Sequence, residues 1–203
     1  MEILFSDREL AVCVKPVGLD SEAEVPAALR EILGGQIFPV HRLDKNVGGV
    51  MVYARTKGAA AALSKAVGEG TMIKEYVALV HGLPPEKGDW EDLLWKDSKK
   101  NKVYAVKRER VGVKRARLEF TRLRGGELSL VRIRLHTGRS HQIRVQFASR
   151  GFPLAGDHKY GARDENPVPM LFSCRLTFPC GGKTRTFEKL PDWAEFETEK
   201  ETE

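Results

Sequence analysis

Short apolar blocks recur along this chain, and glycine, proline or charged residues separate them. The blocks "LAVCVKP", "VMVYA", "MIKEYVALVHG", "RARLEFTRL" and "LSLVRIRL" have the length and the β-branched content of strands. In "LSLVRIRL" the alternation predicts that apolar side chains take one face and charged ones the other. Two further strand-like blocks, "MLFSCRLTFP" and "KTRTFEKL", follow towards the end of the chain.

Three segments have the pattern of helices. "EVPAALREILGG" carries Pro26 in its first turn and Gly34 at its end. "TKGAAAALSKAVGEG" is rich in alanine, the best helix former. In "RSHQIRVQFASRG", Ile143 and Phe147 are four residues apart and therefore share one helical face. Residues 83–102 are polar and rich in turn-forming residues, and this pattern predicts an excursion or flap.

The order of these elements indicates the fold class. Strands follow strands more often than they alternate with helices, which disfavours a doubly wound parallel sheet. We therefore expect an α+β fold with a mixed, largely antiparallel sheet and flanking helices. The chain has no internal repeat and no long linker, so we expect one domain over residues 1–190 and an acidic, flexible tail over residues 191–203.

Composition is that of an ordinary globular protein, with 41% hydrophobic and 31% charged residues. No stretch approaches the ~20 uninterrupted apolar residues of a membrane helix, and the N-terminus lacks the pattern of a secretory signal. The three cysteines are odd in number and lack metal-like spacing, which favours reduced thiols in the cytoplasm. We expect no membrane partner, no bound metal and a monomeric protein.

Positive charge is concentrated in one part of the chain. The formal net charge is +6, but residues 96–124 alone contain twelve Lys or Arg and three acidic residues. A clustered basic surface suits a polyphosphate partner, because each neutralised phosphate releases counterions. The alternative is an ordinary solvated face, and charge alone leaves both interpretations open.

Polar residues interrupt the apolar pattern at three places: "HRLD", "KEY" and "HTGRSHQIR". A carboxylate next to an arginine, as at Asp44, suits attack on an electrophilic carbon or proton removal better than general-acid catalysis. Tyr76 offers a ring on which a base can stack and a phenol for proton transfer. Taken singly, such residues more often form a surface ion pair and a core tyrosine, and an arginine such as Arg144 more often occupies an exposed helical position.

Motifs of several other enzyme classes are missing from the sequence. The five histidines form no HExxH and no Cys/His quartet, which disfavours a metal site. Neither the phosphate-binding G-x-x-x-x-G-K-[ST] nor the nucleophile motif G-x-S-x-G occurs. Nucleotide hydrolysis and serine-type acyl transfer therefore lack their usual residues.

Four segments, in order, resemble the RluA-type family of RNA pseudouridine synthases. They are "ILFSDRELAVCVKPVGL", "HRLDKNVGG", "KEYVALVHG" and "HTGRSHQIRVQFASRGFPLAGDHKYG". The resemblance implies a pseudouridine synthase-like fold with a central RNA-binding cleft, and no cofactor. It also implies isomerisation of specific uridines in rRNA or tRNA, by breaking the N1–C1′ bond, turning the base and rejoining it through C5.

The resemblance also implies roles for individual residues. Asp44 is the expected catalytic aspartate, Tyr76 the ring that stacks on the uracil and helps to remove the C5 proton, and Arg144 the partner of Asp44. The expected RNA-binding residues are His41, Arg42, Lys74, Arg139, His141 and Gln142. The "GDHKYG" segment, with Tyr160, is interpreted as a tight structural turn.

One departure from the family pattern leaves alternatives open. The family usually has Thr-Ser-Gly where this chain has Val47-Gly48-Gly49, so two hydroxyls near Asp44 are missing. An inactive RNA-binding module is therefore a rival to the isomerase. A second rival is an RNA-cleaving enzyme that uses His136 or His141 with Tyr76. Whether Asp44 attacks C1′ or removes the C2′ proton is not decided by the sequence.

Overall fold

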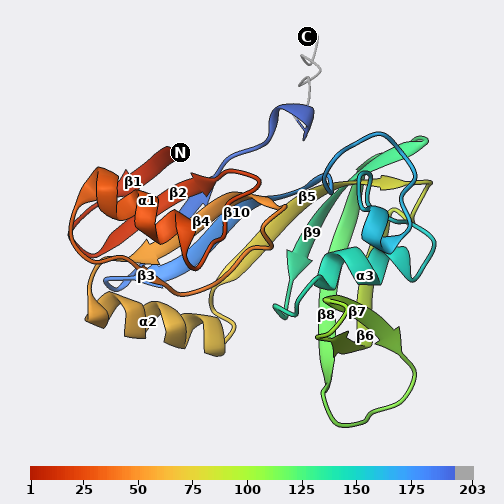
Figure 1. Cartoon of the computed structure of the whole chain (residues 1–203), viewed down its shortest axis with the longest axis horizontal. Coiled ribbons are helices and arrows are strands. Elements are labelled where there is room, and N and C mark those ends of the chain that lie inside the picture. Colours follow the sequence, from red (N-terminus) through yellow and green to blue (C-terminus); the bar gives the residue numbers. More distant parts are fainter. Residues whose placement is uncertain (195–203) are drawn as a thin grey trace.

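The computed structural model describes residues 1–194, which form one twisted eleven-stranded sheet with three α-helices (Figure 1). The strands are β1 (Glu2–Ser6), β2 (Leu10–Lys15), β3 (Phe38–Pro39), β4 (Gly48–Ala54), β5 (Ile73–His81), β6 (Lys87–Asp97), β7 (Lys102–Val106), β8 (Val113–Arg124), β9 (Leu128–Leu135), β10 (Leu171–Cys180) and β11 (Lys183–Glu188). The helices are α1 (Glu24–Leu33), α2 (Lys57–Gly68) and α3 (Gln142–Ala148), with short 3₁₀ turns at His158–Tyr160 and Asp192–Ala194.

The sheet is mixed and largely antiparallel, as the sequence predicts. Its order is β1-β2-β4-β10-β5-β9-β8-β6-β7, with β11 added to β10 and β3 added to β4. Among the described strands the one parallel pairing joins β4 to β10, at Gly48 and Gly49. The three α-helices lie where their apolar periodicity places them.

The long strands β5 and β10 run through the middle of the molecule and divide it into two halves (Figure 1). One half contains β1, β2, β4, α1 and α2, and the other contains β6 to β9 and α3. In the second half α3 packs on an aromatic cluster, in which the Trp90 ring lies 4.4 Å from Phe120 and 4.7 Å from Phe147. Six consecutive residues of α3 are buried as a result.

The excursion predicted over residues 83–102 is present, but it is built mainly of regular strand and not of turns. Most of this segment is β6, which pairs with both β7 and β8 and joins them in a projecting arm. The alternation of apolar and polar residues in β6 is not visible in the sequence, because two inward positions, Gly88 and Asp92, are not apolar. Asp92 is instead satisfied by ionic and hydrogen-bond contacts with Arg150 and Gln146.

The described chain remains packed on the sheet beyond residue 190. Trp193 and Ala194 lie against an apolar patch that includes Val77, Leu130 and Cys174, and Ala194 is buried. Residues 195–203, the remainder of the predicted acidic tail, lie outside the described residues. None of the described helices combines the length and the apolar character that crossing a membrane requires.

Candidate active site

The three polar segments singled out in the sequence meet in one cleft of about 610 Å³. The "KEY" and "HTGRSHQIR" segments meet because the start of β5 is paired with the end of β9, at Lys74 and Leu135. The loop that contains Asp44 forms the opposite wall, and the end of α2 contributes Val67 and Gly68. The cleft therefore lies between the two halves of the sheet.

Hydrogen bonds to the backbone of Leu43 fix the loop on the N-terminal side of Asp44. The Ser21 hydroxyl is buried; it donates to the carbonyl of Leu43 at 3.0 Å and accepts from the amide of Leu43 at 3.2 Å. The Tyr53 hydroxyl in turn donates to the carbonyl of Ser21 at 2.8 Å. A rigid loop places the carboxylate with little freedom, which favours reaction at one fixed position.

Lys15 fixes the other side of the same loop. Its ammonium group donates to the carbonyls of Pro16, Leu19 and Lys45, at 2.8–3.1 Å. Burial lowers the pKa of Lys15 to about 8, against the opposing effect of nearby acidic groups that include Asp44. Neither Lys15 nor Ser21 was predicted as a site residue, because a lysine and a serine near a turn carry no distinctive pattern.

Arg144 joins Asp44 to a second carboxylate. Its Nη1 lies 3.5 Å from Asp44 Oδ2, and its Nε and Nη2 lie 2.6 Å and 2.8 Å from the two oxygens of Asp157. Asp157 is 1% exposed, so this bidentate pair is desolvated and strongly directional. Arg144 is thus near Asp44, as predicted, but its orientation is determined mainly by Asp157.

Within residues 1–194, the polar contacts of the Asp44 carboxylate all use one of its two oxygens. Both Arg144 and His141 approach Oδ2, with His141 Nε2 at 3.8 Å. Oδ1 is left without a protein partner there, so its lone pairs are available to a substrate. The same carboxylate is 21% exposed, which gives a ligand in the cleft access to it.

Tyr76 lies in the floor of the cleft and is 6% exposed. Burial raises the pKa of Tyr76 well above its ordinary value, and the charge of Asp44 adds to the effect. The neutral phenol is therefore the form present near neutral pH. This form suits ring stacking and hydrogen-bond donation better than proton removal.

Of the six predicted RNA-binding residues, His141 lies beside Asp44. The other five fall into two groups, of which the first faces solvent or the cleft. The side chain of Arg42 is 61% exposed and pairs with Glu22 at 3.0 Å. Arg139 is exposed and donates from Nε to the carbonyl of Arg115 at 3.0 Å. Lys74 lines the cleft, where burial lowers its pKa. These side chains can reach a phosphate.

The second group, His41 and Gln142, makes hydrogen bonds within the protein. His41 Nε2 accepts the amide of Val52 at 3.2 Å. Gln142 is 3% exposed, and its Oε1 accepts from the Thr137 hydroxyl at 2.8 Å and from the Arg139 amide at 3.0 Å. These bonds brace the loops around the cleft, which both residues line, and their contact with RNA stays a prediction.

We predict that His41 makes the stability of the folded protein sensitive to acid. Burial lowers its pKa from 6.5 to about 3, so an unfolded chain binds a proton between these values that the folded chain does not. Stability is therefore lost as pH falls below 6.5, by up to roughly 1.4 kcal/mol per pH unit. We expect His41→Gln, which keeps an acceptor for Val52, to lose less stability than wild type between pH 7 and pH 5 in urea unfolding. Equal losses in both proteins would contradict this account.

Sequence reasoning also missed the roles of Asp157 and Tyr160. Both belong to "GDHKYG", which forms a tight turn as predicted, but both side chains also contact residues that line the cleft. Asp157 holds Arg144, and the hydroxyl of Tyr160 lies 2.9 Å from His141 Nδ1. The sequence feature that could have identified both residues is their polar character at the end of the fourth motif segment.

The departure from the family pattern lies at Val47 and Gly48, since Gly49 matches the family glycine, and the space beside both glycines is filled by the protein itself. A Cβ on Gly48 would meet the carbonyl of Lys15 at 3.2 Å and the ring of Phe172 at 3.3 Å, inside the protein. A Cβ on Gly49 would lie 2.4 Å from a backbone oxygen of Ser173. Val47 is 2% exposed and packs in the core, with an edge on the cleft.

In residues 1–194 we find no group of three or more His, Cys, Asp or Glu side chains arranged to bind a metal ion. The arrangement instead offers a fixed carboxylate, a guanidinium and a buried aromatic ring around one cavity. Such a set can bind a planar base and react at an adjacent electrophilic carbon.

Comparisons with known proteins agree with this chemistry. A family model described as RNA pseudouridylate synthase matches residues 9–149. An uncharacterized RNA pseudouridine synthase of Aquifex aeolicus is 34% identical, over 85% of this chain and 60% of that protein. The tRNA pseudouridine synthase C of Haemophilus ducreyi is 31% identical, over 82% and 76%. The ribosomal large subunit pseudouridine synthase D of Zymomonas mobilis is 33% identical, over 79% and 56%.

Eight relatives match the chain over most of its length, and seven of them are much longer than it. The chain spans 41–60% of the length of those seven proteins. Among solved structures, human RNA pseudouridylate synthase domain containing 4 superposes with a TM-score of 0.80 at 24% identity, over 95% of this chain and 89% of that one. Human RNA pseudouridylate synthase domain containing 1 gives 0.82 at 22% identity, over 94% and 83%. These two establish the fold, and the family model and the sequence relatives show that the chain belongs to the RluA-type RNA pseudouridine synthase family.

Proposed function

We propose that this protein isomerises specific uridines of rRNA or tRNA to pseudouridine, without a cofactor. The observation that carries the proposal is the position of Asp44, held near Arg144 in a cleft whose floor is Tyr76. We assign the activity to the single domain expected over residues 1–190, acting as a cytoplasmic monomer.

The reaction needs a carboxylate at the ribose. Asp44 either adds to C1′ or removes the C2′ proton, and each route breaks the N1–C1′ bond and leaves the electron pair on the uracil. In the addition route Asp44 leaves C1′ again when C5 of the turned uracil attacks, and in the abstraction route the proton taken from C2′ returns to C2′ as C5 bonds to C1′. In both routes the C5 proton is then lost to solvent and N1 takes up a proton, so atoms and charge balance. Arg144 orients the carboxylate, and the ring of Tyr76 holds the turning base.

The target uridine must leave its stack to reach Asp44, which costs a few kcal/mol. Binding energy from the rim of the cleft and from the arm supplies this cost. Arg42 projects from the Asp44 loop and is suited to enter the space that the base vacates. Because bases of single-stranded loops are already accessible, a stem-loop is the favoured substrate class.

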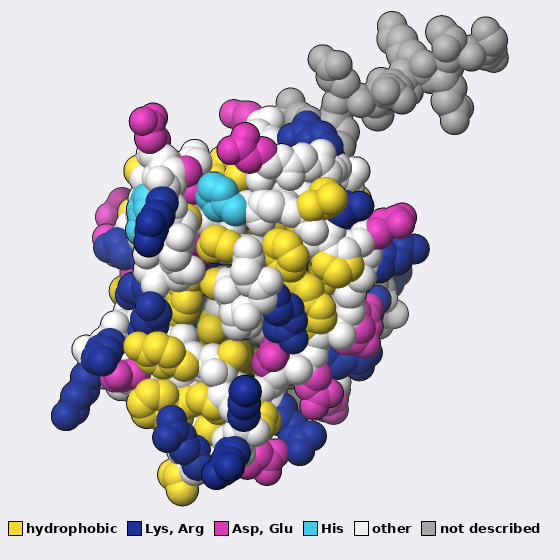
Figure 2. All heavy atoms as spheres, turned by 90° about the vertical axis from the view of Figure 1, so that its right-hand side faces the viewer, with side chains coloured by type: hydrophobic (Ala, Val, Ile, Leu, Met, Phe, Trp, Pro, Cys, Tyr) yellow, Lys and Arg dark blue, Asp and Glu magenta, His cyan; other side chains and the backbone are white. Residues whose placement is uncertain are grey.

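The arm provides much of the positive charge that faces RNA. Figure 2 views the molecule from its side and shows Lys and Arg side chains gathered at the lower end, with acidic ones among them. Arg115 and Arg117 pair with neighbouring acids. Lys107, Arg108 and Lys114 are exposed, and none has an acidic partner within the described residues.

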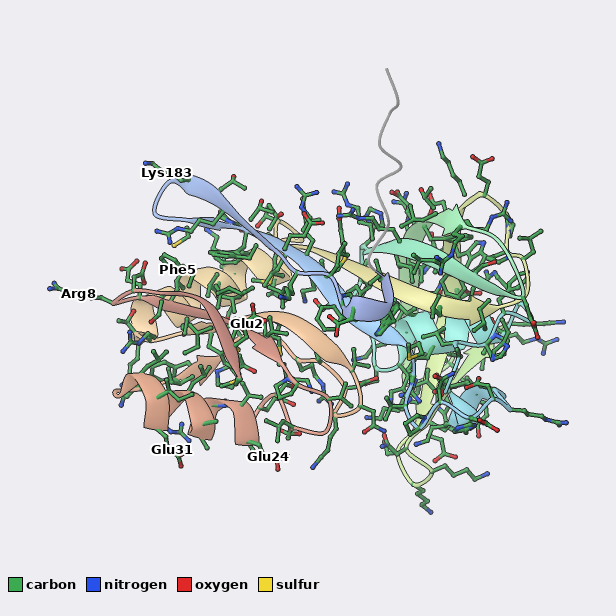
Figure 3. The ribbon with its side chains drawn as sticks, turned by 90° about the horizontal axis from the view of Figure 1, so that it is seen from above. Glu2, Phe5, Arg8, Glu24, Glu31 and Lys183 are labelled. Carbon is green, nitrogen blue, oxygen red and sulfur yellow. The ribbon has the colours of Figure 1, made fainter. Side chains whose placement is uncertain are left out.

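The affinity for stem-loop RNA is expected to fall steeply as the salt concentration rises, and the arm is expected to account for part of this dependence. Replacing both Lys107 and Arg108 by alanine should reduce the slope of log K against log salt by roughly 1 to 2. Arg8 and Lys183 lie at the opposite end of the molecule (Figure 3), so their double alanine variant is the matched control. Fluorescence anisotropy over a salt series measures both slopes. An equal reduction in the two variants would contradict the placement of RNA on the arm.

Release of tritium from C5-labelled uridine in RNA tests the proposed function. The isomerase releases tritium to solvent and leaves the RNA at full length. An inactive RNA-binding module would bind the RNA and release none. An RNA-cleaving enzyme would shorten the RNA, which a denaturing gel detects. Total RNA from cells that lack the protein serves as substrate, and mapping the new pseudouridines then distinguishes rRNA from tRNA.

A further inference from the structure

His141 has an unusual backbone conformation. It precedes α3 with φ 50° and ψ 23°, and Asn101 is the other non-glycine residue with positive φ in the described chain. Left-handed conformations cost roughly 1–2 kcal/mol per residue outside glycine. Such strain persists where the surroundings impose it, often at a functional site. The conformation directs the two ring nitrogens of His141 towards different partners, Tyr160 and Asp44.

The hydroxyl of Tyr160 determines which nitrogen of His141 carries the proton. Its oxygen accepts the backbone amide of Val103 at 2.8 Å, and an amide can only donate. Its own single proton then has one partner within the described residues, His141 Nδ1 at 2.9 Å. Burial raises the pKa of Tyr160 to about 12, so that proton is present at all working pH values.

The charge state of His141 follows from its surroundings. Burial lowers the pKa of His141, and the charges of Arg144 and Lys159 act in the same direction. Asp44 and Asp157 act in the opposite direction. A neutral ring carries one proton only.

We propose that Tyr160 holds His141 as the tautomer protonated at Nε2, which presents an N–H to Asp44 and to a uridine bound beside it. His141 is then a positioning residue for the Asp44 carboxylate, and Tyr160 is a positioning residue that acts through His141. The present separation of 3.8 Å between Nε2 and Oδ2 exceeds a hydrogen bond, so a small closure on substrate completes the contact.

The same contacts connect the arm to the reacting groups. Val103 belongs to β7 in the arm, and the chain of hydrogen bonds runs from its amide through Tyr160 to His141. The ring of Tyr160 also lies between two cations, with Arg144 at 5.1 Å and Lys102, again on β7, at 5.4 Å. RNA that moves the arm therefore changes the support of His141. This inference rests on the proposed function for its role at Asp44, but the tautomer itself does not.

Nitrogen NMR of the imidazole rings in the full chain tests the tautomer directly. In wild type, His141 should show a protonated Nε2 and an unprotonated Nδ1. His41, whose Nε2 accepts the amide of Val52, should show the reverse and serves as an internal reference. In Tyr160→Phe, His141 should shift towards a mixture of tautomers while His41 stays unchanged. A protonated Nδ1 on wild-type His141, or an unchanged ring in the variant, overturns the inference.

Two substitutions of His141 test its role, with tritium release as the readout and thermal unfolding as the check on folding. His141→Gln can place an N–H near the position of Nε2, whereas His141→Leu fills similar space without a donor. We expect Gln to keep the turnover number within about tenfold of wild type and Leu to lose about a hundredfold. Equal losses overturn the role. If wild type itself releases no tritium, the proposed function fails, while the NMR result still decides the tautomer.

Discussion

Replacing Asp44 by asparagine is expected to lower tritium release from C5-labelled RNA by about a thousandfold or more, while RNA affinity stays within about threefold. An amide is neutral, so it neither adds to C1′ nor removes a proton from C2′. Folding should be retained, because the shorter contacts of Arg144 are those with Asp157. Tritium release and fluorescence anisotropy, on the same preparation and RNA, measure the two quantities.

Glu31→Gln is the matched control for Asp44→Asn. Both changes replace a carboxylate with its amide, but Glu31 is an exposed residue of α1 (Figure 3). We expect the control to release tritium at the wild-type rate. More than a tenth of wild-type activity in Asp44→Asn would show that another group performs the chemistry.

Gly49→Ala is expected to destabilise the fold severely, by roughly 4 kcal/mol or more. Gly49 has φ +133°, and an added Cβ would lie 2.4 Å from the carbonyl oxygen and 2.5 Å from the amide nitrogen of Ser173. Both atoms belong to the backbone of β10, so the β4–β10 pairing has to open to admit the methyl group. For a domain of this size the melting temperature should fall by roughly 10 °C or more.

Gly48→Ala provides the comparison, because the neighbouring glycine has room for a methyl group after small shifts. Its Cβ would meet its nearest atoms at 3.2–3.3 Å, and two of these belong to the ring of Phe172. We expect a loss of about 1 kcal/mol or less in urea unfolding. Gly48→Ser, which restores a family hydroxyl, should fold similarly. Equal melting temperatures for the alanine variants at 48 and 49 would refute the steric argument.

The fold class was predictable because most strands carry their own signal. Segments such as β5 and β9 are apolar enough to be recognised singly, and the glycine-containing turn between β8 and β9 indicates antiparallel pairing. The arm strand β6 was missed because its inward positions include Gly88 and Asp92, and Asp92 is satisfied by Gln146 of the distant α3 and by Arg150 just beyond that helix. A local pattern cannot anticipate a partner that tertiary structure supplies.

The site was predictable in part for a similar reason. The motif segments identified Asp44, Tyr76 and Arg144, and the fold brings all three to one cleft. Motif membership gave no information on side-chain direction, so His41 was expected to face RNA although its Nε2 binds the Val52 amide. Asp157 was interpreted as a turn residue because its bidentate contact with Arg144 exists only in the folded chain.

The central claim is that the Asp44 carboxylate rebuilds the glycosidic bond of a uridine as a carbon–carbon bond. Digesting RNA to nucleosides after reaction, and separating pseudouridine from uridine by chromatography with mass spectrometry, measures that bond directly. Wild type should form pseudouridine in amounts equal to the tritium released, and Asp44→Asn should form none. Pseudouridine made by Asp44→Asn at the wild-type rate, or none made by wild type from any cellular RNA, would contradict the account.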